Sequence, residues 1–296
     1  MKKEPSLALF EEHRQLLFAI AYRMLGTVMD AQDMVQNTYL RWQESSPDEV
    51  QSARAWLTTV ITRLCINHLQ LARVQRETYV GTWLPEPLVE APGNNPAENA
   101  QLADSLSLAF LLLLETLAPT ERAVFILREG FDREFSEIAG IVGKSEANCR
   151  QILTRARKRI EERRPRFDAN LAPDAAEKLI TPFLRAVREG DFDGLLAAMA
   201  QDVVLVTDGG GKARAIPEPL HGAAPVAKLL VNVTRQYGSK SEDIRFARIN
   251  GLPGFVSFDG VTPLRVMAFG VQDGLISALF VITNPDKLRH LTPPAR

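Results

Sequence analysis

The chain has 296 residues, and its 35 Lys and Arg against 36 Asp and Glu give a formal net charge of −1. This length predicts two or three compact domains, and the charge balance excludes a protein that binds polyanions through its bulk charge. Cys65 and Cys149 lie in apolar helical stretches and are expected to be core residues, not a disulfide or a metal site. The chain lacks an apolar run of about 18 residues, and its charged start is unlike a signal peptide, so we expect a soluble, cytoplasmic protein.

Residues 6–42 predict two helices that are separated near Gly26. The second helix, AQDMVQNTYLRW, places most of its apolar residues on one side and Asp33, Gln36 and Asn37 on the other. This polar face is either solvated surface or a docking surface for another protein.

Residues 53–77, ARAWLTTVITRLCINHLQLARVQRE, predict a long amphipathic helix. The stretch from Val50 to Arg76 has no acidic residue. Outside its apolar face it carries basic and hydrogen-bonding side chains, Arg54, Thr58, Thr62, Arg63, Asn67 and His68, and Arg73 lies further along the same stretch. Such side chains on an acid-free helix suit unpaired DNA, which is held by backbone charge and by contacts to bases.

Residues 78–100 form a linker rich in Pro, Gly and Asn. It contains WLPEPL, with Trp83, Leu84 and Pro85, which a flexible tether does not require. We therefore expect this segment to dock on a neighbouring domain, or to pack locally against the adjacent one.

An apolar helix is predicted over residues 102–117, and Pro119 starts the next helix. Two short helices then follow, separated at Gly143, with Ser145 as the N-cap of the second. This pattern predicts a helix-turn-helix. The second helix has an apolar face that includes Cys149 and Ile152 and a polar face made of Asn148, Arg150, Gln151, Thr154 and Arg155. Eight Lys or Arg between Arg150 and Arg166 suit DNA phosphates, although a solvated basic face is the simpler interpretation.

The C-terminal third predicts helices first and then strands separated at Gly251, Gly260 and Gly274. This order predicts an α+β cone with a curved sheet that can enclose a pocket. Its DGGGK stretch, Gly209, Gly210, Gly211 and Lys212 after Asp208, lacks the spacing of a phosphate-binding loop.

Two blocks resemble a known family. AYRMLGTVMDAQDMVQNTYLRW with ARAWLTTVITRLCINHL resembles region 2 of extracytoplasmic-function sigma factors, and residues 117–160 resemble their region 4. The resemblance implies a promoter-specificity subunit of bacterial RNA polymerase. Its second helix, with Asp33, Gln36 and Asn37, would contact the clamp helices of the largest catalytic subunit. Region 4 would lie near the flap of the second-largest subunit.

The same resemblance assigns DNA contacts. The helix with Arg54, Arg63, Asn67 and Arg73 would open and hold the −10 element. Asn148, Arg150, Gln151, Thr154 and Arg155 would read the −35 element, although Ile152 replaces a residue that is often basic in the family.

The C-terminal third resembles the SnoaL-like branch of the NTF2-like fold, which some sigma factors carry as a fused regulatory extension. The resemblance implies that three motifs meet at an interdomain interface: WLPEP, DGGGK from Asp208 to Lys212, and NPDKL with Asn284, Pro285, Asp286 and Lys287.

The fold class we expect is multidomain, with two all-α sigma domains and a C-terminal α+β NTF2-like cone. The domains are residues 1–76 (region 2), 77–101 (linker), 102–166 (region 4) and 174–296 (SnoaL-like domain). We expect a sigma factor that is regulated in cis, with no cofactor, no metal and no enzyme activity, and with a candidate small-molecule site in the cone.

Two other interpretations stay open. One is a ligand-sensing helix-turn-helix regulator that works without polymerase. The other is a SnoaL-type enzyme tethered to DNA, with Asp208, His221 and Asp259 as candidate acid–base residues. However, Asp208 could equally be a turn cap and His221 a loop residue, and the sequence does not place an acid–base pair.

Overall fold

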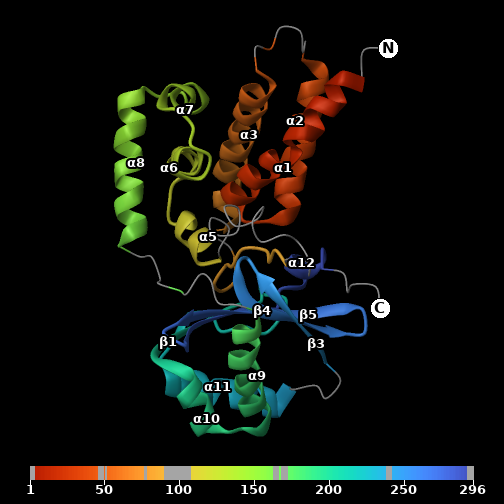
Figure 1. Ribbon diagram of the computed structural model, residues 1–296, viewed down its shortest axis with the longest axis vertical. Coiled ribbons are helices and arrows are strands. Elements are labelled where there is room, and N and C mark those ends of the chain that lie inside the picture. The colour runs from red at the N-terminus through yellow and green to blue at the C-terminus, as the bar shows by residue number, and fades with distance from the viewer. Residues whose placement is uncertain are drawn as a thin grey trace. The chain divides into compact units, whose positions relative to one another are not determined.

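The computed structural model describes residues 4–45, 50, 52–76, 79–89, 108–162, 167, 173–237 and 242–291. The chain divides into two compact units (Figure 1). Unit 1 combines Met1–Thr78 with Ala109–Arg164, and unit 2 combines Tyr79–Leu108 with Pro165–Arg296. The predicted linker beyond residue 89, the start of the apolar helix predicted from residue 102, and most of the region after residue 162 lie outside the described residues.

Unit 1 begins with a bundle of α1 (Glu4–Leu25), α2 (Val28–Glu44) and α3 (Ala53–Arg76). Gly26, with φ of 72°, follows the last turn of α1, because a left-handed residue ends a helix at little cost when it has no Cβ. The core includes the fully buried Trp42, whose ring centroid lies 5.3 Å from that of Trp56. The two predicted helices on either side of Gly26 are confirmed.

The second part of unit 1 contains α5 (Leu108–Glu115), α6 (Pro119–Phe125), the π-helical turn η2 (Ile126–Gly130), α7 (Phe135–Val142) and α8 (Glu146–Glu161). Gly143, with φ of 66°, ends α7, and the Ser145 hydroxyl accepts a hydrogen bond from the Asn148 backbone N–H at 3.3 Å. Cys149 and Ile152 are buried on the inner face of α8. The predicted helix-turn-helix is therefore present, with its expected break and N-cap.

Unit 2 contains one six-stranded sheet with three helices on one face (Figure 1). The helices are α9 (Pro173–Glu189), α10 (Phe192–Ala198) and α11 (Ala223–Tyr237). The strands are β1 (Met199–Asp208), β2 (Leu220–His221), β3 (Asp243–Ile249), β4 (Leu252–Asp259), β5 (Thr262–Gln272) and β6 (Leu275–Ile282), in the order β2-β1-β6-β5-β4-β3. The short helix α12 (Pro285–Leu288) follows β6. The α+β architecture and the antiparallel β3–β6 meander agree with the sequence prediction.

The parallel pairing of β1 with β6 was not predicted, and it positions the main site of unit 2. It aligns Asp208, the last residue of β1, with Ile282, the last residue of β6. The backbone N–H groups of Thr283 and Asn284 donate to the Asp208 carbonyl at 2.8 and 3.0 Å. The DGGGK and NPDKL motifs therefore begin side by side.

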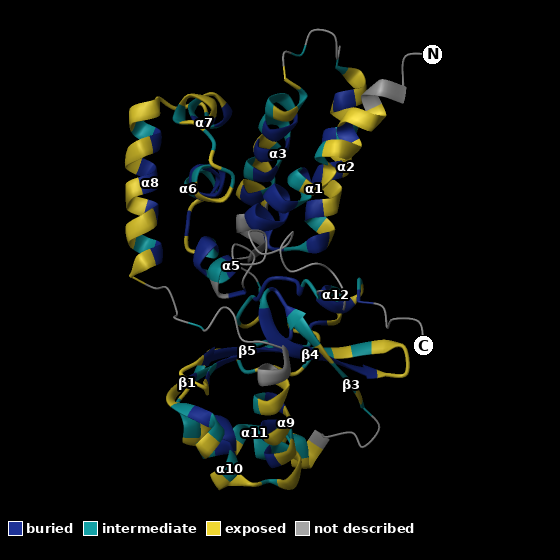
Figure 2. Ribbon diagram, viewed as in Figure 1, coloured by how far each residue is buried: buried dark blue, intermediate teal, exposed yellow. Residues whose placement is uncertain are grey.

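Aromatic side chains fill the space between the sheet and the helices. Phe183 of α9 meets Phe269 of β5 edge-on, with ring centroids 5.6 Å apart, and Phe255 of β4 lies 6.1 Å from Phe269. All three are at most 2% exposed, and Figure 2 shows the buried strands as a dark blue layer. This packing is the apolar core of unit 2.

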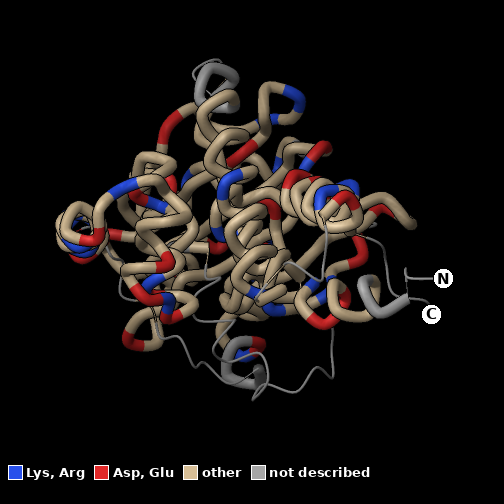
Figure 3. The backbone as a smooth tube through the Cα atoms, turned by 90° about the horizontal axis from the view of Figure 1, so that it is seen from above, with Lys and Arg blue, Asp and Glu red and all other residues tan. Residues whose placement is uncertain are grey.

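Positive and negative side chains are distributed along the described backbone. Figure 3 shows Lys and Arg positions interleaved with Asp and Glu positions. Any DNA-binding surface must therefore be a local face of a helix, as the near-zero net charge already indicated.

Candidate functional site

The outer face of α2 combines polar and apolar side chains. Asp33, Gln36 and Asn37 are exposed, and they lie between Met29 and Leu40, which are 51% and 48% exposed. These positions recur at helical spacing, so they share one face. An exposed stripe with apolar ends is typical of a surface that binds another protein.

The predicted DNA-strand face of α3 is only partly open. Arg54 and Asn67 are exposed, whereas Thr58 and Thr62 are 1% and 0% exposed. Our expectation that these two threonines remain available outside the apolar face of α3 is wrong, because α1, α2, α6 and α7 all pack against α3. Arg73 lies in α3, and its side chain is outside the described residues.

Arg63 of α3 contacts the helix-turn-helix directly. Its Nε donates to the Ile141 carbonyl at 3.0 Å, and a terminal guanidinium nitrogen donates to the Gly140 carbonyl at 2.7 Å. Both acceptors belong to the last turn of α7. The side chain proposed for DNA is therefore occupied by protein in this structure.

The outer face of α8 presents most of the residues that were predicted to read DNA. Arg150, Gln151, Thr154 and Arg155 are exposed, and Asn148 is half-buried near the start of the helix. The Arg150 guanidinium lies 4.7 Å from the centre of the Phe135 ring and donates to Glu146 at 3.0 Å.

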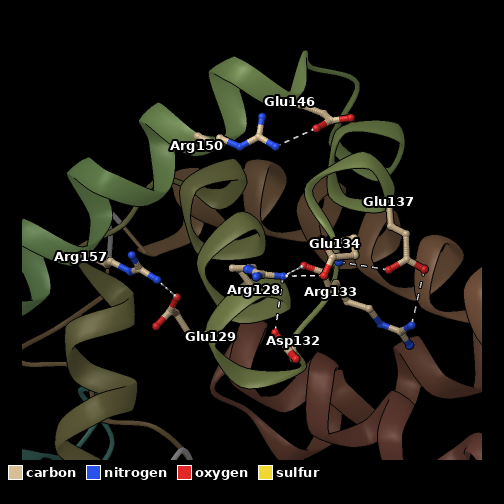
Figure 4. Close-up of polar contacts among 9 residues, drawn as sticks. All are labelled: Arg128, Glu129, Asp132, Arg133, Glu134, Glu137, Glu146, Arg150 and Arg157. Atoms are coloured by element: carbon tan, nitrogen blue, oxygen red, sulfur yellow. Dashed lines mark hydrogen bonds and ion pairs between the residues drawn. The ribbon is translucent and has the colours of Figure 1, made fainter.

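Figure 4 shows that acidic side chains of unit 1 pair with two of the α8 arginines, Arg150 with Glu146 and Arg157 with Glu129. The Arg150 and Arg157 side chains are 56% and 57% exposed. Exposed ion pairs contribute about 0–1 kcal/mol, so either arginine can exchange its carboxylate for a phosphate or a base at little cost.

In unit 2, the linker residues 79–89 are bound by a set of side chains that we call the linker clamp: Asp208, Asn284 and Lys287, with the glycine turn Gly209–Gly211. Lys287 is 5% exposed, and Asp208 is 0% exposed. The Lys287 ammonium donates to Asp208 Oδ2 at 2.7 Å and to the Leu84 carbonyl. The Leu84 backbone N–H donates to Asp208 Oδ2 at 2.8 Å. Asp208 and Lys287 thus bind both polar backbone groups of one linker residue.

Two aromatic rings complete the surroundings of the ammonium. Lys287 Nζ lies 4.2 Å from the centre of the Trp83 ring and 5.1 Å from that of Tyr79. Cations are attracted to the faces of such rings, more strongly when they are withdrawn from water. Trp83, which a mere tether would not require, therefore contributes to the binding of a buried charge.

The Tyr79 hydroxyl donates to Asp208 Oδ1 at 2.5 Å and accepts a hydrogen bond from the Asn284 side-chain amide at 3.0 Å. Burial, and then the hydrogen bond to Asp208, raise the pKa of Tyr79 above its ordinary value, so the phenol stays protonated as a donor. Sequence reasoning missed Tyr79, which lies just before the WLPEP motif.

The glycine turn fits closely under the linker. A Cβ on Gly210 would lie 2.1 Å from Asn284 Nδ2, and a Cβ on Gly211 would lie 3.1 Å from Val80 Cβ. Lys212 forms an ion pair with Asp286, which holds the pKa of that carboxyl below its usual value. The DGGGK and NPDKL motifs therefore shape a contact surface for the linker.

Further contacts hold the far end of the docked segment. The Leu88 backbone N–H donates to Asn250 Oδ1 at 3.0 Å, and the Asn250 N–H donates to the Leu88 carbonyl at 2.9 Å. A ring nitrogen of His290 lies 2.8 Å from the Pro87 carbonyl, and Val89 forms a β-bridge with Ile249. Neither Asn250 nor His290 was singled out from the sequence, because nothing local in their stretches marks them as linker partners.

The three candidate acid–base residues do not form one site. Asp208 is bound to the linker, His221 lies in β2, and Asp259 ends β4. Since β2 and β4 are four strand positions apart, His221 and Asp259 are separated by roughly 19 Å along the sheet. Among the described residues, no group of three His, Cys, Asp or Glu side chains could hold a metal ion, and none of the described helices could span a membrane.

Comparisons with known proteins agree with the helical regions of unit 1. Residues 9–74 match the family model Sigma-70 region 2, and residues 107–160 match Sigma-70, region 4. The chain is 37% identical to ECF RNA polymerase sigma factor SigJ of Mycobacterium tuberculosis strain H37Rv, over 94% of this chain and 91% of that protein. The chain belongs to the ECF RNA polymerase sigma factors. Its function is therefore to direct RNA polymerase to promoters, as the sequence predicted.

Two further matches extend to the C-terminal third of this sigma factor. A probable ECF sigma factor, SigI of M. tuberculosis strain CDC 1551, is 29% identical over 97% of this chain and 96% of its own length. The crystal structure of M. tuberculosis SigJ superposes with a TM-score of 0.75 at 34% identity, covering 96% of this chain and 98% of that one. These matches span the C-terminal unit as well as the sigma regions.

Proposed function

We propose that this sigma factor docks on RNA polymerase through the outer face of α2. Asp33, Gln36 and Asn37 would contact the clamp helices of the largest catalytic subunit, and region 4 would lie near the flap of the second-largest subunit. The stripe from Met29 to Leu40 supports this assignment, because apolar side chains that are about half exposed beside polar ones are typical of a protein-binding surface.

We further propose that α3 binds the opened strand at the −10 element through Arg54, Arg63, Asn67 and Arg73, and that α8 reads the −35 element. Extruding a base costs a few kcal/mol of stacking, which contacts to the flipped base offset. Arg150, Gln151, Thr154 and Arg155 would contact the upstream duplex together with Asn148. The exposure of the first four on α8 supports this role.

The C-terminal unit, in this proposal, regulates the sigma regions in cis through the linker clamp. The main support is that Lys287 and Asp208 are buried where they bind the Leu84 backbone. Tyr79 and Trp83 contact the same two side chains. A linker that only rested on the surface would not bury two charged side chains. The burial of Lys287 and Asp208 therefore supports a specific docked state.

Docking changes how far the two sigma regions can separate. The 31 residues between Arg76 and Leu108 span at most about 100–110 Å when fully extended. When residues 79–89 are docked, only residues 77–78 and 90–107 remain to be extended, and these 20 residues add at most about 65–70 Å to the fixed span of the docked segment. A switch between docked and released linker would therefore change which promoter spacings the two regions reach together.

Catalysis by the NTF2-like unit is not part of the proposed function. The separation of His221 from Asp259 and the engagement of Asp208 by the linker argue against a SnoaL-type enzyme. A small-molecule ligand in the cone stays a prediction. It would have to displace aromatic side chains such as Phe183 and Phe269 from the described interior.

The test is in vitro transcription with core polymerase, on a promoter selected from random DNA. Arg150→Ala should reduce discrimination at the upstream element by about 1–3 kcal/mol, the range for one bidentate base contact, and Lys158→Ala on the far end of α8 is the control. Asp33→Ala should weaken polymerase binding, whereas Glu44→Ala on the same helix should not. Wild-type discrimination and affinity in both test variants would refute the assigned surfaces.

A regulator that works without polymerase gives a different result in the same experiment. It would bind the selected duplex tightly by itself, fail to copurify with core polymerase and start no RNA. That outcome would contradict the proposed docking surface on α2 and the strand-binding role of α3 together.

A further inference from the structure

The segment that follows α8 carries one aromatic side chain. In EERRPRFD, residues 161–168, Phe167 stands among six charged residues and one proline, a composition that is typical of a solvated connector and has no need of an aromatic ring. In the structure, the Phe167 ring meets the ring of Phe280 of β6 edge-on, with centroids 6.3 Å apart. Phe280 is 4% exposed, so Phe167 contacts a buried apolar partner in unit 2.

The sheet leaves room for this ring at Gly270 of β5. A Cβ at position 270 would lie 2.4 Å from Phe167 Cε1, and the three nearest atoms that it would meet all belong to the Phe167 ring. Gly270 does not have the left-handed backbone that Gly210 has, so its conformation alone does not call for glycine. The missing side chain at Gly270 therefore serves the close approach of Phe167.

Phe167 packs on the face of the sheet that points away from the helices. Phe269 of β5 packs on α9, so Gly270, the next residue, faces the other way. Ala268 shares the orientation of Gly270 and pairs with Phe280, so the Phe280 side chain points away from the helices as well.

The linker clamp uses the same face and the same strand. Ile282, two residues after Phe280 in β6, pairs with Asp208 of the linker clamp. Two residues of a strand span roughly 7 Å, so the Phe167 contact and the linker clamp meet β6 at neighbouring positions. Region 4 lies between residues 79–89 and Phe167 in the sequence, and the chain is therefore bound to one sheet both before and after region 4.

We propose that Phe167 is a second anchor through which the C-terminal unit holds region 4 from its other end. The anchor shares no residue with the linker clamp, so release of residues 79–89 alone does not free region 4. This inference rests on the proposed function, because it deepens the regulation in cis that we assign to the C-terminal unit.

The anchor shortens the connection to α8, the helix that is proposed to read the −35 element. From Glu161, the last residue of α8, to Phe167 the chain can span at most about 20–22 Å. Without the anchor the connection runs to Pro173 at the start of α9, and its maximal span doubles to about 40–43 Å. Loss of the anchor would therefore give α8 a wider range of positions and weaken the selection among promoter spacings.

The first experiment measures how fast trypsin cleaves the full-length protein after Arg166, next to the anchor. A protease needs the residues around its target bond in an accessible, locally opened conformation, so an anchored Phe167 slows this cleavage. Phe167→Ala and Gly270→Ala should each raise the initial rate about two- to tenfold, the range for loss of one aromatic contact. Gly270→Ala fills the space of the ring and leaves the cleaved segment unchanged.

The matched control for cleavage is Phe192→Ala, which removes a 39% exposed aromatic side chain of α10 in the same unit. It should cleave at the wild-type rate. Wild-type cleavage in both the Phe167 and the Gly270 variant would overturn the anchor.

The double variant tests the contact itself by chemical denaturation. In the wild-type background Gly270→Ala should lower the midpoint, because its Cβ displaces the Phe167 ring. In the Phe167→Ala background that space is free, and alanine is no worse than glycine in a strand, so the same substitution should leave the midpoint unchanged or raise it. An equal loss in both backgrounds would show that Gly270 does not serve Phe167.

In vitro transcription separates the anchor from the proposed function. On promoters that differ only in the spacing between the −35 and −10 elements, both anchor variants should reduce the preference for the best spacing about two- to tenfold. Faster cleavage with an unchanged spacing preference would overturn the control of region 4 by the anchor. The proposed DNA and polymerase surfaces fail separately, through wild-type behaviour of Arg150→Ala and Asp33→Ala, and the cleavage result does not depend on them.

Discussion

At the scale of single residues, the central feature of unit 2 is a buried ion pair. Asp208 and Lys287 have side chains that are 0% and 6% exposed, and burial removes hydration from both. Such a pair is stable only if its remaining donors and acceptors find partners. The partners here come from the linker, through the Leu84 backbone and the Tyr79 hydroxyl. Removal of the linker would leave the pair under-satisfied, which makes docking favourable.

Asp208→Asn should release the linker. The substitution keeps the shape of the side chain but leaves the Lys287 ammonium buried without its counter-charge, at a cost of about 3–5 kcal/mol. The measurement is hydrogen exchange at the Leu84 amide in the full-length protein, together with the free energy of unfolding. Asp202→Asn, at an exposed position of the same strand, is the control. If the Leu84 amide stays protected in the Asp208 variant, the carboxylate does not hold the linker.

At the scale of elements, the glycine turn Gly209–Gly211 determines how closely the linker approaches. Gly210 has φ of 57°, a left-handed conformation that favours glycine. Its missing side chain also leaves room for the Asn284 amide, which in turn donates to Tyr79. The left-handed backbone and the close approach of Asn284 therefore both favour glycine at position 210.

Gly210→Ala compared with Gly260→Ala separates these two requirements. Gly260 has φ of 58°, and a Cβ there would meet no atom within 4 Å, so both variants carry similar backbone strain of about 1 kcal/mol. Only the Gly210 variant displaces Asn284, so it should lose about 1–3 kcal/mol more in the free energy of unfolding. Chemical denaturation of both variants tests this, and equal losses would show that the linker does not need the close approach.

Local patterns predicted most elements, because periodicity and turn residues are local. Gly143 and Ser145 bound the turn of the helix-turn-helix as expected, and the β3–β6 meander follows its glycine turns. Long-range partners were not predictable in this way. Tyr79 meets Asp208 across 129 positions of sequence, and Arg63 meets Ile141 across 78. Neither contact has a local signature, so Asp208 could equally have been a turn cap.

The boundary of the C-terminal module illustrates the same limit. Composition assigned residues 77–101 to a separate linker, since Pro, Gly and Asn are typical of connecting segments. In the structure, residues 79–89 are bound to the C-terminal unit through hydrogen bonds and a β-bridge. Composition describes how a segment behaves alone, and docking depends on the surface that receives it.

At the scale of the whole molecule, the chain joins two DNA-binding regions through a segment that a third module binds. A regulatory module of this kind acts only if the docked and released states differ in their contacts. The difference here is the loss of the hydrogen bonds that Tyr79, Leu84 and Leu88 make with unit 2. Because the same segment joins region 2 to region 4, the proposed regulation would make one binding equilibrium affect both DNA contacts together.

Tyr79→Phe in two backgrounds tests this coupling. In the full-length protein the substitution removes the hydrogen bond to Asp208 and the one accepted from Asn284. It should change transcription about two- to tenfold, in the same direction as deletion of residues 173–296. In the chain that ends at residue 172 the partner is absent, so the same substitution should have no effect on transcription. A double-mutant comparison of this kind isolates the interaction itself. Equal effects of Tyr79→Phe in both backgrounds would mean that the linker acts on polymerase or DNA directly, and that the NTF2-like unit does not regulate through it.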